Sequence, residues 1–136
     1  MDFSIKTGLR REATAMVDEH NTAIAMGSGS LPVYATPALA ALMEKAAAEL
    51  VDAELSGEWT SVGTLLNIEH IAATPIGLSV RAEAELTAAE GRKLSFCVTA
   101  FDGVEMIGRG THQRFLVKKE NFMQKAVCKT LKNSGQ

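Results

Sequence analysis

Apolar residues recur at helical spacing along one long segment that begins near residue 36. A Thr-Pro pair opens this segment, and Thr36 and Pro37 suit the N-cap and first helical positions because proline lacks the N–H that would be left unbonded there. The pattern predicts a helix from residue 36 to about residue 57, closed by a glycine. Its apolar face consists of Leu39, Leu42, Met43, Ala46 and Leu50. Much of the remaining circumference is alanine, which favours a helix enclosed by other structure.

Beyond the helix the apolar period changes to two, the period of half-buried strands. Alternation predicts strands over residues 62–70, 78–86, 94–100 and about 105–117, with a hairpin turn at residues 102–103. The first of these strands is expected to place five residues on one side: Val62, Thr64, Leu66, Ile68 and His70. A short amphipathic helix is expected over residues 119–131, and the segment before residue 26 is expected to supply a further strand.

These elements predict an α+β fold, because short connections make the strands antiparallel and the long helix must cover their apolar face. One antiparallel sheet of about five strands wrapped around one long helix, with a short C-terminal helix, is the hot-dog fold. We expect residues 1–136 to form one domain, with a loop at residues 27–30 and a disordered tail at residues 132–136. The exposed sheet edges predict a homodimer with a continuous sheet, or a dimer of such dimers.

Composition narrows the function classes. The chain has 136 residues and a formal net charge of −2, which provides no general field for binding nucleic acid. Apolar runs are shorter than the roughly 18 residues of a membrane span, and the first residues lack a signal-peptide pattern. Cys97 and Cys128 are too few and too distant for a disulfide framework or a zinc site, and we expect reduced thiols in the cytoplasm. No clustered metal ligands are expected.

Glu44 is the first candidate for chemistry. Helical geometry places it beside Ala40, Ala47 and Ala48, away from the charged side of the helix. A carboxylate ringed by alanines loses hydration unless it has a partner, a setting that suits a general base or nucleophile. The alternative is a surface glutamate on the flank of a helix, which pattern alone favours.

His70 and Thr36 are two further candidates. His70 ends a strand on its apolar side, where it is either a core histidine or a catalytic one. Thr36 either caps the helix or holds a water or a substrate carbonyl, with the Ala38 and Leu39 N–H groups as further donors. Thr36 and Glu44 are separated by about 12 Å along a straight helix, so substrate between them, or a second subunit, is needed to unite them.

His112 and Arg114 fall on one face of the strand in the segment GRGTHQR. The glycines of this segment indicate a bulge or a close backbone approach, and a solvated arginine beside a bulge is an equally good interpretation. His20 is expected in a surface loop. Dinucleotide, P-loop and hydrolase-elbow fingerprints are absent from the sequence.

Three segments together resemble a known family. VYATPALAALMEKAAAEL, SVGTLLNIEHIAATPIGLSVRAEAEL and EGRKLSFCVTAFDGVEMIGRGTHQRFLV are similar to the fluoroacetyl-CoA thioesterase-like branch of the hot-dog superfamily. The resemblance implies an acyl-CoA thioesterase that acts as a homodimer with its sites at the subunit interface. It implies catalytic roles for Thr36, Glu44 and His70, and substrate binding by Gly63 and Arg114.

The resemblance also implies that coenzyme A enters only as part of the substrate, with no other cofactor. The fluoroacetyl-specific enzyme is aromatic before the helix, where this chain has GSGSLPVY, so a short or branched acyl group is expected. By charge alone, the cations expected to contact the phosphates of coenzyme A are Arg92, Lys93, Arg114, Lys118 and Lys119.

Two other functions fit the same fold. One is a non-catalytic acyl-CoA sensor or binding module that keeps the pocket and lacks turnover. The other is an enoyl-CoA hydratase, although the paired aspartate and histidine of that branch are missing. Release of free coenzyme A separates an enzyme from a binding module.

Overall fold

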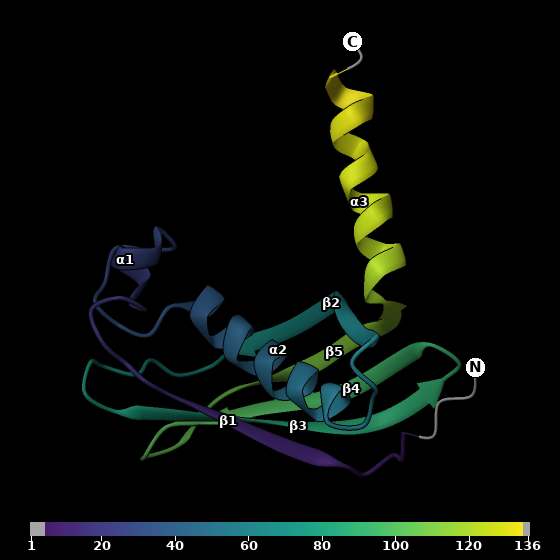
Figure 1. Ribbon diagram of the computed structural model, residues 1–136. Coiled ribbons are helices and arrows are strands. Elements are labelled where there is room, and N and C mark those ends of the chain that lie inside the picture. The colour runs from purple at the N-terminus through teal and green to yellow at the C-terminus, as the bar shows by residue number, and fades with distance from the viewer. Residues whose placement is uncertain (1–4, 135–136) are drawn as a thin grey trace.

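The computed structural model describes residues 5–134, which form one curled sheet, a long helix against it and a second helix that projects away (Figure 1). The strands are β1 (Arg10–Met16), β2 (Trp59–His70), β3 (Ser79–Glu90), β4 (Lys93–Phe101) and β5 (Met106–Lys118). All neighbouring strands are antiparallel, in the order β1-β3-β4-β5-β2. The helices are α1 (Ala23–Met26), α2 (Thr36–Asp52) and α3 (Lys119–Ser134). The α+β hot-dog architecture expected from the sequence is confirmed.

The core lies between α2 and the sheet. The predicted apolar face of α2 is buried, and Val80, Ala82, Ala84 and Leu86 of β3 are fully buried opposite it. Small residues let the helix approach closely: a Cβ added at Gly108 of β5 would lie 2.8 Å from Leu39 Cδ2. Ala41 and Lys45 on the far side of α2 are exposed, so within this chain the sheet covers one side of the helix.

The ends of α2 differ from the prediction. The N-cap is Ala35, and no side chain caps the helix, so the expectation that Thr36 caps it is wrong. The Leu39 N–H bonds the Ala35 carbonyl at 3.0 Å instead, and the Thr36 hydroxyl is directed to another partner. The helix ends at Asp52 rather than near Gly57, because the chain turns at Ala53 and heads into β2.

The two ends of the chain also depart from the prediction. The N-terminal segment supplies β1 as expected, but it also forms the one-turn helix α1, whose end at Gly27 has a left-handed φ of 70°. At the C-terminus α3 runs to Ser134, so residues 132–134 of the predicted disordered tail are helical. Residues 135–136 lie outside the described residues.

A β-bulge divides β2 into two halves. Gly63 pairs with Arg114 and Leu65 pairs with Gln113, so Thr64 is an extra residue and the strand changes parity there. Ser61 and Gly63 therefore share the inner side with Ile68 and His70, although their numbers differ in parity. The prediction that Val62 and Thr64 share a side with Ile68 is wrong because alternation assumes an unbroken strand.

Both sheet edges are open to further pairing within the part of the chain that the structure describes. β1 and β2 are the two edge strands, and β2 carries the exposed residues Gly63, Thr64 and Leu65 near its middle. No helix among residues 5–134 is long and apolar enough to cross a membrane.

Candidate active site

The first part of the candidate site joins the start of α2 to the end of β2. The Thr36 hydroxyl lies 2.8 Å from Nδ1 of His70, within hydrogen-bond distance. Both residues line a cavity of about 290 Å³, together with Tyr34, Ala72 and other mostly small residues. Ser28, from the predicted loop at residues 27–30, also lines it. The small side chains of Ala72 and Ala73, shortly after His70, leave space for this cavity.

His70 has one ring nitrogen without a partner. Its Nε2 atom is buried and makes no hydrogen bond within the described residues. Burial lowers the pKa of His70 below its usual 6.5, and the backbone of Ala72 partly opposes that shift. The imidazole is therefore neutral at pH 7, and in the tautomer whose Nδ1–H donates to the Thr36 hydroxyl, Nε2 is able to accept a proton.

The second part of the candidate site is centred on Glu44. A carboxylate oxygen of Glu44 lies 3.7 Å from the Arg114 guanidinium. A Cβ added at Gly63 would lie 2.5 Å from Glu44 Oε2, so only glycine leaves room for the carboxylate over β2. The Glu44 side chain is 43% exposed, and its charge has a cationic partner. Glu44 therefore has the partner that a carboxylate beside alanines needs, and its side chain is not fully enclosed.

A buried network fixes Arg114. Its Nε donates to the Ser61 hydroxyl at 2.7 Å, and Nη2 donates to the Ser61 carbonyl at 2.9 Å. Nη1 lies 3.2 Å from Nε2 of His112, while Nδ1 of His112 lies 2.8 Å from the Leu65 carbonyl. Because the carbonyl can only accept, Nδ1 carries the proton and Nε2 accepts from Arg114. Burial lowers the pKa of His112, and the adjacent Arg114 cation lowers it further.

This network corrects the interpretation of GRGTHQR as a bulge with a solvated arginine. Arg114 is 7% exposed rather than solvated, Gly110 of β5 marks a close backbone approach to Asn67, and the irregularity of β5 lies at Ile107, just before the segment. His112 and Arg114 do share a face, as predicted. Ser61 was missed by the sequence argument. Its position two residues before Gly63, on the same side of the strand, was the available signal.

The five predicted site residues thus form two clusters rather than one. Thr36 and His70 are in contact, and Glu44, Gly63 and Arg114 are in contact. Along α2, Thr36 and Glu44 are separated by eight residues, or about 12 Å. His20 belongs to neither cluster, and it is an exposed loop residue as predicted.

Comparison with known proteins supplies the family. The model of the family FlK, described as "Fluoroacetyl-CoA-specific thioesterase", matches residues 17–120. The chain belongs to this family. The fluoroacetyl-CoA thioesterase of Streptantibioticus cattleyicolor is 44% identical over 98 residues, which is 72% of this chain and 70% of that protein. Both clusters lie inside the matched range, whereas most of α3 lies beyond it.

Solved structures agree with the FlK family assignment. A structure of the fluoroacetyl-CoA thioesterase FlK is similar with a TM-score of 0.86 and 37% identity, covering 93% of this chain and 98% of that one. A hypothetical protein of Thermus thermophilus, a thioesterase superfamily member, has a TM-score of 0.84 at 23% identity, covering 96% of each chain. At that identity the second likeness establishes the hot-dog fold alone.

Proposed function

We propose that this thioester hydrolase cleaves a small acyl-CoA thioester to the free acid and coenzyme A, with no cofactor beyond the substrate's own coenzyme A. The observation that carries the proposal is the Thr36–His70 pair, which lines a small cavity and leaves the buried Nε2 of His70 without a hydrogen-bond partner among the described residues. Membership of the FlK family supports the same chemistry. We place the enzyme in the cytoplasm, where its two exposed, unbridged cysteines remain reduced.

Thioester hydrolysis places negative charge on the carbonyl oxygen, and backbone N–H groups aimed at that oxygen stabilise it. The Leu39 N–H is already bonded to Ala35, which leaves the Ala38 N–H at the start of α2 as the donor for this role. The neutral imidazole of His70 orients the attacking water, or it takes a proton from that water and then passes the same proton to the departing thiolate. Thr36 holds that imidazole in place through its 2.8 Å contact.

Glu44 acts as nucleophile or as the base that activates water, and Arg114 orients its carboxylate. Because Glu44 and the Thr36–His70 pair form separate clusters in one chain, we place the reaction at the interface of a homodimer. The open edge of β2 suits this interface, since two β2 strands pairing antiparallel would bring the clusters of two protomers together. Light scattering that reports only the 14.5 kDa monomer would contradict this assembly.

The cavity argues for a small acyl group. Its volume of about 290 Å³ lies at the small end of ligand pockets, and Val33, Tyr34, Ala72 and Ala73 narrow it. The segment before α2 is Gly- and Ser-rich in this chain. We therefore favour a short or branched acyl group in the substrate, rather than fluoroacetyl in particular.

A panel of acyl-CoA thioesters with detection of the free thiol tests the function. We expect steady release of coenzyme A from a short-chain member, and loss of that release in Glu44→Gln and His70→Ala. The competing function is an acyl-CoA sensor on the same fold. Tight binding of acyl-CoA without release of thiol from any member would establish the sensor and reject the enzyme.

A further inference from the structure

A second pocket lies at the opposite end of β2 from His70. It is lined by the first residue of β2, the turn between β3 and β4, the end of β5 and the first turns of α3. Its volume is about 350 Å³. Two backbone bonds hold its walls together: Leu116 N–H to the Arg92 carbonyl at 2.8 Å, and Lys119 N–H to the Glu58 carbonyl at 2.9 Å.

The lining of this pocket combines cations with aromatic rings. Arg92, Lys118 and Lys125 contribute three positive charges, and no carboxylate side chain is among its lining residues. The Arg92 guanidinium lies over the Trp59 ring, 5.1 Å from its centroid. A guanidinium stacked on an indole presents a flat platform with hydrogen-bond donors at its edge, a combination that binds nucleobases and phosphates.

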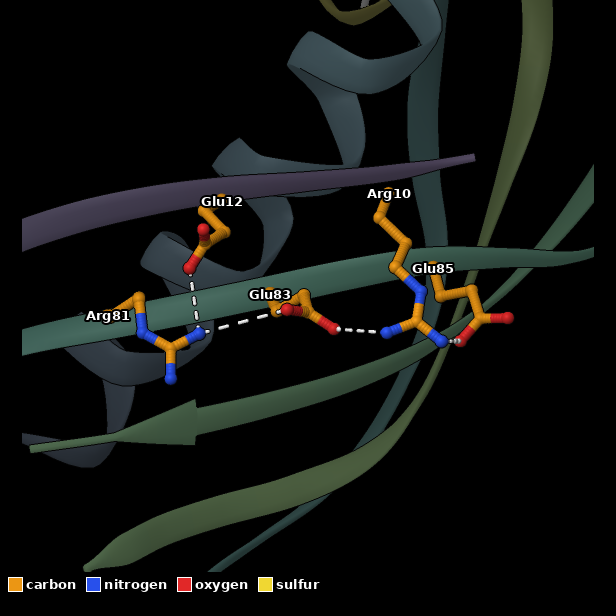
Figure 2. Close-up of polar contacts among 5 residues, drawn as sticks. All are labelled: Arg10, Glu12, Arg81, Glu83 and Glu85. Carbon is orange, nitrogen blue, oxygen red and sulfur yellow. Dashed lines mark hydrogen bonds and ion pairs between the residues drawn. The ribbon is translucent and has the colours of Figure 1, made fainter. Parts of the chain in front are cut away.

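Arg81 of β3 shows what a purely structural arginine looks like. Arg81 lies over the Phe101 ring at 4.7 Å, but Glu12 lies 2.7 Å and Glu83 lies 3.7 Å from its guanidinium. Figure 2 shows that this ladder continues through Arg10 to Glu85, so each cation is matched by carboxylates. Within the described residues Arg92 has no such carboxylate partner. Its charge is available to an anionic ligand.

We propose that this pocket, called here the Trp59 pocket, binds the phosphorylated nucleotide end of coenzyme A in the acyl-CoA substrate. The proposal rests on the proposed thioesterase function, which supplies a ligand with both an adenine ring and phosphates. Trp59 and Arg92 stack against the adenine, while Lys118 and Lys125 contact the phosphates. The pocket draws on α3, most of which lies outside the range shared with the family.

The location of the pocket fits a dimer. Trp59 and His70 are the two ends of β2, eleven residues or about 36 Å apart, too far for one substrate to join them within a chain. A second β2 strand pairing antiparallel over its full length would place Trp59 opposite the partner's His70. The Trp59 pocket of one protomer then anchors the nucleotide of a substrate whose thioester lies in the partner's catalytic cavity.

Binding measurements test the pocket without relying on turnover. Trp59 is the only tryptophan of the chain, so its fluorescence reports directly on this pocket. We expect its emission to change on adding coenzyme A or adenosine 3′,5′-bisphosphate, but not on adding pantetheine. By calorimetry, Arg92→Gln should weaken coenzyme A binding roughly tenfold, the scale of one lost stacking contact with a base. The matched control Arg81→Gln should bind coenzyme A as the unmodified protein does.

Unchanged Trp59 emission at saturating coenzyme A, or equal affinity of Arg92→Gln and the unmodified protein, would overturn the proposal. Kinetics give a second reading through the ratio of kcat/KM for acyl-CoA to kcat/KM for the matching N-acetylcysteamine thioester. Arg92→Gln should lower this ratio about tenfold, and a partly folded variant does not bias it. Turnover with an unchanged ratio would reject nucleotide binding at the Trp59 pocket but leave the thioesterase function standing. Trp59-dependent binding of coenzyme A without turnover would reject the thioesterase function but leave the binding pocket standing.

Discussion

The Thr36 hydroxyl contacts Nδ1 of His70 at 2.8 Å, joining the first residue of α2 to the last residue of β2. The contact links two residues that are 34 positions apart in the chain, and it replaces the helix cap that the sequence suggested. Thr36 therefore holds the imidazole rather than the end of the helix.

Thr36→Ala separates these two roles. We expect kcat/KM to fall about tenfold or more, because the hydrogen bond that orients His70 is lost. The melting temperature should change little, since no capping bond is removed. Thr36→Ser, which keeps the hydroxyl, should retain most of the activity. A large drop in melting temperature with normal activity would restore the capping role.

Glu44→Gln tests the carboxylate chemistry. The substitution keeps the shape of the side chain and removes its charge, so we expect kcat to fall at least about a hundredfold, the scale of a positioned acid–base group. Glu49→Gln, five residues further along α2 and part-buried like Glu44, is the matched control and should keep its activity. Near-normal turnover of Glu44→Gln on the best substrate would remove Glu44 from the mechanism.

Much of the fold was predictable because hydrophobic periodicity reports burial directly. The alternation of Val80, Ala82, Ala84 and Leu86 located β3, and the apolar spacing after Thr36 located α2. The inner side of β2 was not predictable in the same way. A bulge at Thr64 changes the parity of the strand, and the signal for it lies in pairing with β5 rather than in the local pattern.

The candidate site was predictable as a set of residues but not as an arrangement. The resemblance to the FlK family named Thr36, Glu44 and His70, whereas their division into two clusters depends on how α2 lies across the sheet. The burial of Arg114 depends on Ser61 and His112, which lie far from each other in sequence. A single sequence carries no information on such long-range hydrogen bonds.

Gly63→Ala tests the packing of the Glu44 carboxylate. The added Cβ would lie 2.5 Å from Glu44 Oε2, the far end of a flexible side chain, so the carboxylate can move aside without disturbing the backbone. We expect activity to fall about tenfold or more while melting changes little, because a displaced catalytic group loses its reactive geometry. Gly110→Ala is the contrasting control: its Cβ would overlap the Asn67 carbonyl, part of the backbone, and should destabilise the fold. Full activity in Gly63→Ala would show that Glu44 need not occupy this position.

The last prediction concerns stability in acid. His112 is 1% exposed and neutral, with Nδ1–H bonded to Leu65 and Nε2 accepting from Arg114. Burial, reinforced by the Arg114 cation, lowers its pKa in the folded protein below the usual 6.5, while the unfolded chain takes up the proton near that value. Stability from this group is therefore full above pH 6.5 and declines as the pH falls below it, by at most about 1.4 kcal/mol per pH unit.

Urea unfolding between pH 8 and pH 5 measures the decline. His112→Asn should flatten it relative to the unmodified protein, whereas His20→Asn at the exposed loop should not. Because the pKa of His70 is lowered in the same sense, some decline should remain in His112→Asn. Stability that rises on acidification below pH 6.5 would show that His112 is protonated in the folded protein, and the Arg114 network would then need a different arrangement.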